Sequence, residues 1–157
     1  MLQLLRSLLC LLIISGCDSQ NATDTTSDSK PALTFKPATT LQQTMEWVLD
    51  PAADLIWASA GAIITEEGTE DLAPTTDEAW DHVRNNAAIV AETGNLLMMP
   101  SHALGEHDWM ELSRGLVDAG LLALSAAEAK DADALFTAGG QIYNVCRACH
   151  QQYMIKE

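Results

Sequence analysis

Apolar residues in the C-terminal segment of the chain recur at alternating intervals of four and three. The positions are Leu135, Gly139, Ile142, Cys146, Cys149 and Tyr153. This spacing puts all of them on one stripe of an α-helix, and a stripe this regular is typical of a seam between packed helices. A second stripe, Phe136, Tyr143 and His150, repeats every seven residues beside the first. The segment therefore has to bury one helix face against other helices.

Three further helical patterns precede this segment, and no stretch gives a convincing strand signal. They cover approximately residues 41–64, 75–99 and 107–130. The third pattern ends at Lys130 and the fourth opens at Asp131, so these two helices should pack antiparallel. Abundant Ala, Leu, Met and Glu, beside only 9 Gly and 5 Pro, also favour helix. We predict an all-α fold.

Proline and threonine residues mark the boundaries of the first two helical patterns. Pro51 interrupts the first pattern, which predicts either a kink there or a new helix with Asp50 as its cap. Thr75 and Glu78 fit a capping box that opens the second helix. We expect residues 65–75, between the two patterns, to form an acidic loop.

The first sixteen residues have the pattern of a secretory signal peptide. One positive charge at Arg6 precedes the apolar stretch 7–14, which is too short to span a membrane. The run Ile14-Ser15-Gly16-Cys17 resembles a bacterial lipobox, in which cleavage before the cysteine leaves a lipid-modified residue. We expect a signal peptide at 1–16 and a lipid anchor on Cys17. An ordinary signal peptide with an incidental cysteine is the alternative.

Residues 17–40 predict a flexible polar tether, because they are rich in Ser, Thr, Asp and Asn and lack apolar periodicity. The folded domain is then expected at 41–157, in the periplasm and anchored to a bacterial membrane. Asp18 resembles an inner-membrane retention signal of enteric bacteria. Whether the membrane is the inner or the outer one stays open.

The chemistry of the chain is concentrated in residues 146–150. Cys146, Cys149 and His150 form a Cys-x-x-Cys-His motif, the attachment signature of a c-type haem. The two thiols add to the two haem vinyl groups, and the adjacent imidazole is delivered to one axial position of the iron. We predict one covalent haem c, with thioether bonds to Cys146 and Cys149 and with His150 as axial iron ligand.

Zinc binding and thiol-disulfide chemistry are the two other common uses of a cysteine pair. Of the four cysteines, Cys10 is lost with the signal peptide and Cys17 is assigned to lipid, which leaves one pair. A structural zinc site conventionally needs a second pair of ligands. A thioredoxin-like dithiol lies after a strand at the start of a helix, whereas this pair lies near the end of one. A thiol-disulfide oxidoreductase is thus the enzyme alternative, and otherwise we expect no catalysis.

The position of the motif resembles that of the class II c-type cytochromes, the cytochrome c prime family. Only seven residues follow His150, so a second iron ligand has to come from upstream. The resemblance covers residues 41–156 and is sharpest in 124–136 and 146–153, including a tyrosine three residues after the histidine. It implies an antiparallel four-helix bundle with His150 as the fifth ligand. Members of this family are often dimers, which implies a homodimer here.

The resemblance also implies a place for the sixth ligand. In this family the first helix supplies the distal residue, a Met in low-spin members and an apolar residue in members that bind gases. The family pattern of Arg, three residues, then Met or Leu corresponds to Leu41 and Met45. Met45 is the candidate distal ligand, and its thioether favours a reduced, low-spin iron. The alternative is that Met45 is a core residue and the iron is five-coordinate.

Leu41 stands where the family has an arginine, so one haem propionate lacks its expected partner. Arg84, His82 or a tryptophan indole could compensate. Four other residues could act as surrogate iron ligands, although packing or surface roles are simpler for each: Met98, Met99, His102 and His107.

The tryptophans, one methionine and two glycines lead to further predictions about the surroundings of the haem. Met110 and the four tryptophans should fill the core around the haem. Gly139 and Gly140 each cost about 1 kcal/mol in a helix relative to Ala. We expect that these glycines compensate for this cost by letting a neighbouring helix or the haem approach the backbone closely. The alternative is that they make the helix locally flexible.

The predicted function is electron transfer by a membrane-tethered mono-haem cytochrome. The alternative is a five-coordinate haem protein that binds nitric oxide or carbon monoxide. With 22 acidic and 8 basic side chains the chain has a formal charge of −14, which excludes nucleic acid as an expected partner. The acidic runs 66–71 and 77–78 form solvated surface and could steer a basic redox partner protein.

Overall fold

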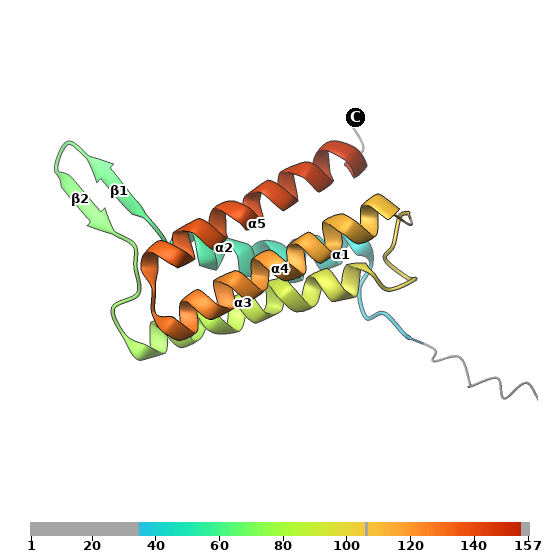
Figure 1. Ribbon diagram of the computed structural model, residues 1–157, viewed down its shortest axis with the longest axis horizontal. Helices are drawn as coiled ribbons and strands as arrows, with labels where there is room; N and C mark the ends of the chain where they lie inside the picture. Colours follow the sequence, from blue (N-terminus) through green and yellow to red (C-terminus); the bar gives the residue numbers. More distant parts are fainter. Residues whose placement is uncertain (1–34, 106, 155–157) are drawn as a thin grey trace, which may run out of the picture. The chain divides into compact units, whose positions relative to one another are not determined.

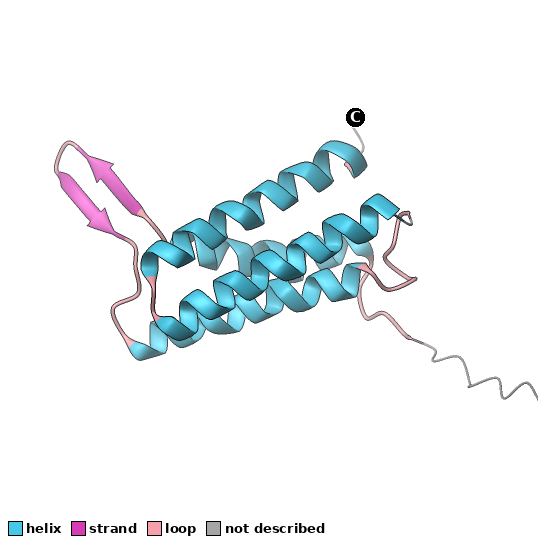
Figure 2. Cartoon of the chain, viewed as in Figure 1, coloured by secondary structure: helices cyan, strands magenta, loops and turns pink. Residues whose placement is uncertain are grey.

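The computed structural model describes residues 35–105 and 107–154. The expected signal peptide, the Cys17 anchor and most of the tether lie outside the described residues. The chain is mostly helical, with one small sheet in the part that the structure describes, so the prediction of a mostly helical chain is confirmed (Figures 1 and 2). The elements are α1 (Leu41–Thr44), η1 (Met45–Leu49), α2 (Asp50–Ala58), β1 (Ala62–Thr65), β2 (Gly68–Asp71), α3 (Asp77–Leu97), α4 (His107–Ala129) and α5 (Ala132–Tyr153).

The three long helices lie side by side. α3 packs along α4, α4 packs along α5, and α2 contacts both α3 and α5 (Figure 1). One shared core lies between these helices, and its largest fully buried apolar side chains are Trp109, Ile56, Leu135, Ile142, Val83 and Val90. Leu135 and Ile142 belong to the stripe that alternates by four and three, so the expected buried face of the last helix is confirmed.

The helix boundaries show how local sequence sets the ends of α3, α4 and α5. Thr76, not Thr75, caps α3, because its side chain accepts a hydrogen bond from the Ala79 N–H at 3.2 Å. The predicted capping box is wrong, because the third residue of the helix is then Ala79, whose methyl side chain cannot complete it. Asp131 caps α5 by accepting from the Ala134 N–H at 2.9 Å. Lys130 has a φ of 54°, the left-handed conformation that ends many helices.

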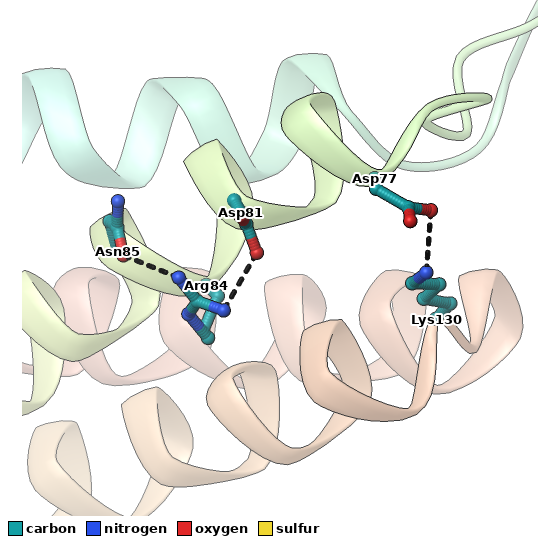
Figure 3. A network of polar contacts seen from close by, with 5 residues as sticks. All are labelled: Asp77, Asp81, Arg84, Asn85 and Lys130. Carbon is teal, nitrogen blue, oxygen red and sulfur yellow. Dashed lines mark hydrogen bonds and ion pairs between the residues drawn. The ribbon is translucent and has the colours of Figure 1, made fainter.

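An ion pair joins the beginning of α3 to the end of α4. Nζ of Lys130 lies 2.7 Å from Oδ1 of Asp77 (Figure 3). The hydrogen bond from Lys130, and then its charge, lower the pKa of the Asp77 carboxyl. On the next turn of α3, Arg84 donates to Asp81 at 2.7 Å and to Asn85 at 3.3 Å. These groups are exposed, so each contact adds little to stability.

The expectation of a new helix at Pro51 is confirmed in part, because α2 begins at Asp50 with Pro51 in its first turn, but Leu49 takes the N-cap position and a π-helical turn precedes the helix. The Asp50 N–H donates to the Met45 carbonyl, five residues earlier, and Leu49 and Asp50 both keep right-handed helical dihedral angles. Asp50 therefore does not cap a new helix. The physical reason lies in Pro51, which has no N–H to donate and whose ring clashes with the carbonyl of an ordinary preceding α-turn. The wider turn accommodates both effects.

A β-hairpin replaces the last residues, 62–64, of the expected first helix and most of the expected acidic loop. β1 and β2 pair antiparallel with Ala62 opposite Asp71 and Thr65 opposite Gly68. The prediction that the chain has no strand was wrong. Gly61, with a φ of 85°, ends the helical path, and the β-branched residues that follow it favour strand. All eight strand residues are exposed.

Candidate cofactor site

One cavity brings the predicted site residues together. It has a volume of about 550 Å³ and lies between α5, α4 and the segment formed by η1 and α2. Its lining residues are Met45, Leu49, Asp50, Ala53, Trp57, Leu97, Leu112, Ser113, Leu116, Tyr143, Val145, Cys146, Arg147, Cys149, His150, Gln151 and Met154. The proposed thioether cysteines, the proposed proximal histidine and the candidate distal methionine thus share one apolar space.

The motif occupies the last turns of α5 and combines buried and exposed groups. Cys146 and Cys149 are half-buried and are not joined by a disulfide, whereas His150 is exposed at the edge of the cavity. Burial raises the pKa of the Cys146 thiol, and the nearby Asp50 and Cys149 raise it further. Burial likewise raises the pKa of Cys149. Both groups are therefore held as neutral thiols at neutral pH.

Met45 lines the cavity from η1, whereas the motif lines it from α5. It is the first residue of the π-helical turn, and its half-buried side chain packs against the hydrophobic core. One turn later, Leu49 and Ala53 extend the same wall. Pi-helical turns often occur at functional sites. The sequence pattern gave the spacing of Met45 but could not predict this backbone.

The C-terminal end of α5 is fixed to α4 by Tyr153 and Gln152. The rings of Tyr153 and Trp109 meet edge to face, with centroids 5.0 Å apart. The Trp109 indole in turn donates to the Leu97 carbonyl at 2.6 Å. Gln152 donates to the Asp108 carboxylate at 3.0 Å. These contacts hold the helix end that carries the motif.

Two of the expected propionate partners, Arg84 and His82, do not line the cavity. Arg84 is paired with Asp81 on α3, and His82 is exposed on the same helix. Trp57 does line the cavity, but its indole N–H donates to the Gly139 carbonyl at 2.9 Å.

Arg147 is a cavity residue that the sequence reasoning missed. It lies inside the Cys-x-x-Cys-His motif and lines the cavity. The ion pairs within residues 35–105 and 107–154 do not include it. Its position between the two cysteines was the signal that could have identified it, because a residue of the motif has to lie close to any group that the motif binds.

None of the four surrogate ligands lines the cavity. Met98 caps the end of α3, Met99 follows it, and His107 is exposed at the start of α4. His102 is buried, and its two ring nitrogens lie 3.1 Å from Thr44 Oγ1 and 2.9 Å from Ser101 Oγ. The structure therefore gives these residues packing, surface or hydrogen-bonding positions.

The expected burial of the tryptophans and the expected close approach at the two glycines are each only partly observed. Trp80 and Trp109 are in the core, but Trp47 is 62% exposed, so the expectation that all four tryptophans fill the core was wrong. At Gly139, an added Cβ would lie 3.2 Å from Trp57 Cδ1, which agrees with close approach of a neighbouring helix. At Gly140, an added Cβ would meet nothing within 4 Å, so close approach does not account for this glycine.

The described residues contain neither a candidate membrane span nor a cluster of conventional metal ligands. No helix in this part of the chain is both long and apolar enough to cross a bilayer. No group of three or more His, Cys, Asp or Glu side chains within 35–105 and 107–154 is arranged to hold a metal ion. A haem iron is held chiefly by the porphyrin and takes only one or two ligands from the protein, so a haem site does not require such a group.

No protein-family model, curated protein or solved structure matches this chain.

Proposed function

We propose that this protein is a mono-haem c-type cytochrome that transfers electrons, with the haem bound through Cys146 and Cys149 and ligated by His150. The observation that carries the proposal is the cavity in which this motif and Met45 meet, although about a hundred residues separate them. A volume of about 550 Å³ is in the range of about 300–1,000 Å³ that is typical of cofactor sites. Its lining is mainly apolar, as a porphyrin requires.

The helix contacts support the antiparallel four-helix bundle that belongs to this proposal. α3, α4 and α5 follow one another through short connections, which favour antiparallel neighbours, and the segment from α1 to α2 supplies the fourth member. The proposed fold and haem type are those of the class II, cytochrome c prime family. The supporting features are the C-terminal motif and a distal wall formed by the first helical segment.

A haem supplies a one-electron couple, and the residues of this chain determine its surroundings. Cys146 and Cys149 would hold the porphyrin covalently, and His150 would give an axial nitrogen. Met45 would give the second axial ligand, a thioether that favours the reduced iron. Leu49, Ala53 and Leu116 exclude water from the cavity wall. Arg147 is the cation available to a propionate.

Two alternative functions make different demands on the same residues. A gas-binding haem protein needs a distal side without a ligand, and the presence of Met45 in the cavity wall is an argument against it. A thiol-disulfide enzyme needs a thiolate, usually made available by a lowered pKa. The raised pKa values of Cys146 and Cys149 argue against that use.

The proposal also covers where the protein acts and with what. A lipid on Cys17 would tether the domain to a bacterial membrane on the periplasmic side, with residues 17–40 as the tether. The charge of −14 favours a redox partner protein with a basic surface. A homodimer is part of the proposal through the family resemblance alone.

The test is to express the chain with a c-type haem maturation system and to record absorption spectra of both oxidation states, with and without carbon monoxide. We expect covalent haem and a low-spin spectrum that the gas does not change. A high-spin spectrum that shifts with the gas would support the gas-binding alternative. Absence of covalent haem would refute the proposal.

Replacement of methionines separates the distal ligand from its neighbours. Met45→Ala should give a high-spin spectrum and a higher affinity for carbon monoxide. Met110→Ala is the matched control, because Met110 is part-buried on α4 and does not line the cavity. Met154→Ala tests the remaining cavity methionine and should leave the spectrum low-spin. An unchanged spectrum in Met45→Ala would refute the assignment of Met45.

A further inference from the structure

A buried polar pair joins the start of the first helical segment to the loop between α3 and α4. Oγ1 of Thr44 lies 3.1 Å from Nε2 of His102, and the two residues are 58 positions apart. Thr44 is fully buried and His102 is only 2% exposed. Among the side-chain to side-chain hydrogen bonds of the described residues, this one alone has both partners buried. Burying two polar groups is costly unless they satisfy each other, so the pair specifies how these segments meet.

Every polar atom of the pair has a partner in one consistent arrangement. The Thr44 hydroxyl donates to the Thr40 carbonyl at 2.9 Å, which leaves its oxygen free to accept from the His102 Nε2–H. The Ser101 hydroxyl then donates to His102 Nδ1 at 2.9 Å. Thr39 contributes a further hydroxyl at 2.7 Å from Thr44 Oγ1. In this arrangement Nε2 is the donor and Nδ1 the acceptor of the His102 ring.

This pair lies directly before the π-helical turn that carries Met45. In a π-turn the chain has one more residue per turn than in an α-helix, so return to an α-helical turn would rotate neighbouring side chains by about 100°. Pro51 constrains the turn from its C-terminal side. On its N-terminal side, Thr44 is held by His102, and Thr40 caps the helix through a capping box with Gln43.

We propose that the Thr44–His102 pair is a positioning device that fixes Met45 toward the cavity and so determines whether its thioether can ligate the haem iron. His102 acts through Thr44 and does not itself touch the cavity. The proposal rests on the proposed function, and it adds that iron coordination depends on a hydrogen bond outside the cofactor site. Loss of the bond should free the segment to turn and withdraw the methionine.

The experiment compares variants of the haem-loaded full chain. Thr44→Val removes the hydroxyl at nearly constant volume and leaves the His102 donor unpaired. We expect a high-spin fraction to appear and the rate of carbon monoxide binding to rise by on the order of tenfold, because a buried unpaired donor is strongly disfavoured. Thr44→Ser restores the hydroxyl and should restore the low-spin spectrum.

Thr93→Val is the matched control, because it makes the same chemical change at another buried hydroxyl. Thr93 is 2% exposed and donates to the Ile89 carbonyl within α3 at 2.7 Å. It should lower stability without changing the spectrum. If Thr44→Val does not fold, Ser101→Ala tests the same network, because it removes the donor to His102 Nδ1. A high-spin fraction has to appear in that variant too.

The outcomes separate this proposal from the proposed function. A folded Thr44→Val or Ser101→Ala variant that stays low-spin and binds carbon monoxide no faster would overturn the positioning role. A wild type that has covalent haem but is already high-spin would also overturn it, while the haem assignment stands. A wild type without covalent haem overturns both. An equal spectral change in Thr93→Val would assign the effect to general destabilisation and refute the specific role.

Discussion

Replacement of Gly120 by alanine should weaken the contact between α3 and α4. A Cβ added at Gly120 would lie 2.6 Å from the backbone nitrogen of Ala91 and 2.8 Å from its Cα. Ordinary contacts between heavy atoms are about 3.5–4.0 Å long, so the two helices would have to separate by roughly 1 Å. The obstacle is backbone, which cannot rotate away as a side chain can.

The magnitude follows from two opposing contributions to the free energy of unfolding. Alanine in place of glycine within a helix stabilises by about 1 kcal/mol. Overpacking of a close contact costs about 1–3 kcal/mol, and a backbone obstacle belongs at the upper end. We expect Gly120→Ala to lower the free energy of unfolding by about 2 kcal/mol in total. For a domain of this size, the melting temperature should fall by roughly 5–10 °C.

Gly140→Ala is the matched control, because it makes the same change within another long helix. An added Cβ at Gly140 meets nothing within 4 Å, so only the gain of about 1 kcal/mol remains. The two variants should therefore differ by about 3 kcal/mol. Urea denaturation followed by circular dichroism measures both. The packing argument is refuted if Gly120→Ala is as stable as the wild type, or if the two variants lose the same stability.

Three further predictions concern charge and packing. Asp77→Asn should lower the melting temperature at pH 6, because the Lys130 hydrogen bond lowers the pKa of the Asp77 carboxyl. The difference from the wild type should shrink as the pH falls and the carboxyl becomes protonated, and a difference independent of pH would contradict this prediction. Arg147→Gln should lower the reduction potential of the proposed haem in a redox titration, since a nearby cation favours the reduced iron, while Arg84→Gln, at a residue that does not line the cavity, should not. Trp57→Phe removes the hydrogen bond to Gly139 and should lower the urea midpoint, and an unchanged midpoint would show that this bond adds nothing.

The helical part of the fold could be predicted because its signals are local and repeated. The stripe through Leu135 and Ile142 identified the buried face of α5, and Asp131 identified its start. The hairpin was missed because each strand has only four residues and no face is buried, so no alternation of apolar and polar residues marks it. The π-turn was missed because spacing alone does not specify which carbonyl accepts a given N–H.

The candidate site likewise has one part that the sequence identifies and one part that depends on the packing of the helices. Cys146, Cys149 and His150 are adjacent in sequence, so one short motif identified all three. The meeting of this motif with Met45 depends on how distant helices pack, and in the sequence only the family resemblance suggests it. Composition alone could not predict that Trp47 is exposed, because this depends on which face of η1 the neighbouring helices cover.

The hairpin leaves the helical body and returns to it at almost the same point. The Leu72 N–H donates to the Gly61 carbonyl at 3.0 Å, so the two ends of the excursion are joined by a hydrogen bond. The length and content of residues 62–71 are thereby independent of the spacing between α2 and α3. An epitope or a reporter peptide could replace this excursion without moving a helix, provided that Gly61 keeps its left-handed conformation beside Phe136. The hairpin is therefore a site at which a peptide tag can be inserted to immobilise the protein on a surface in a chosen orientation.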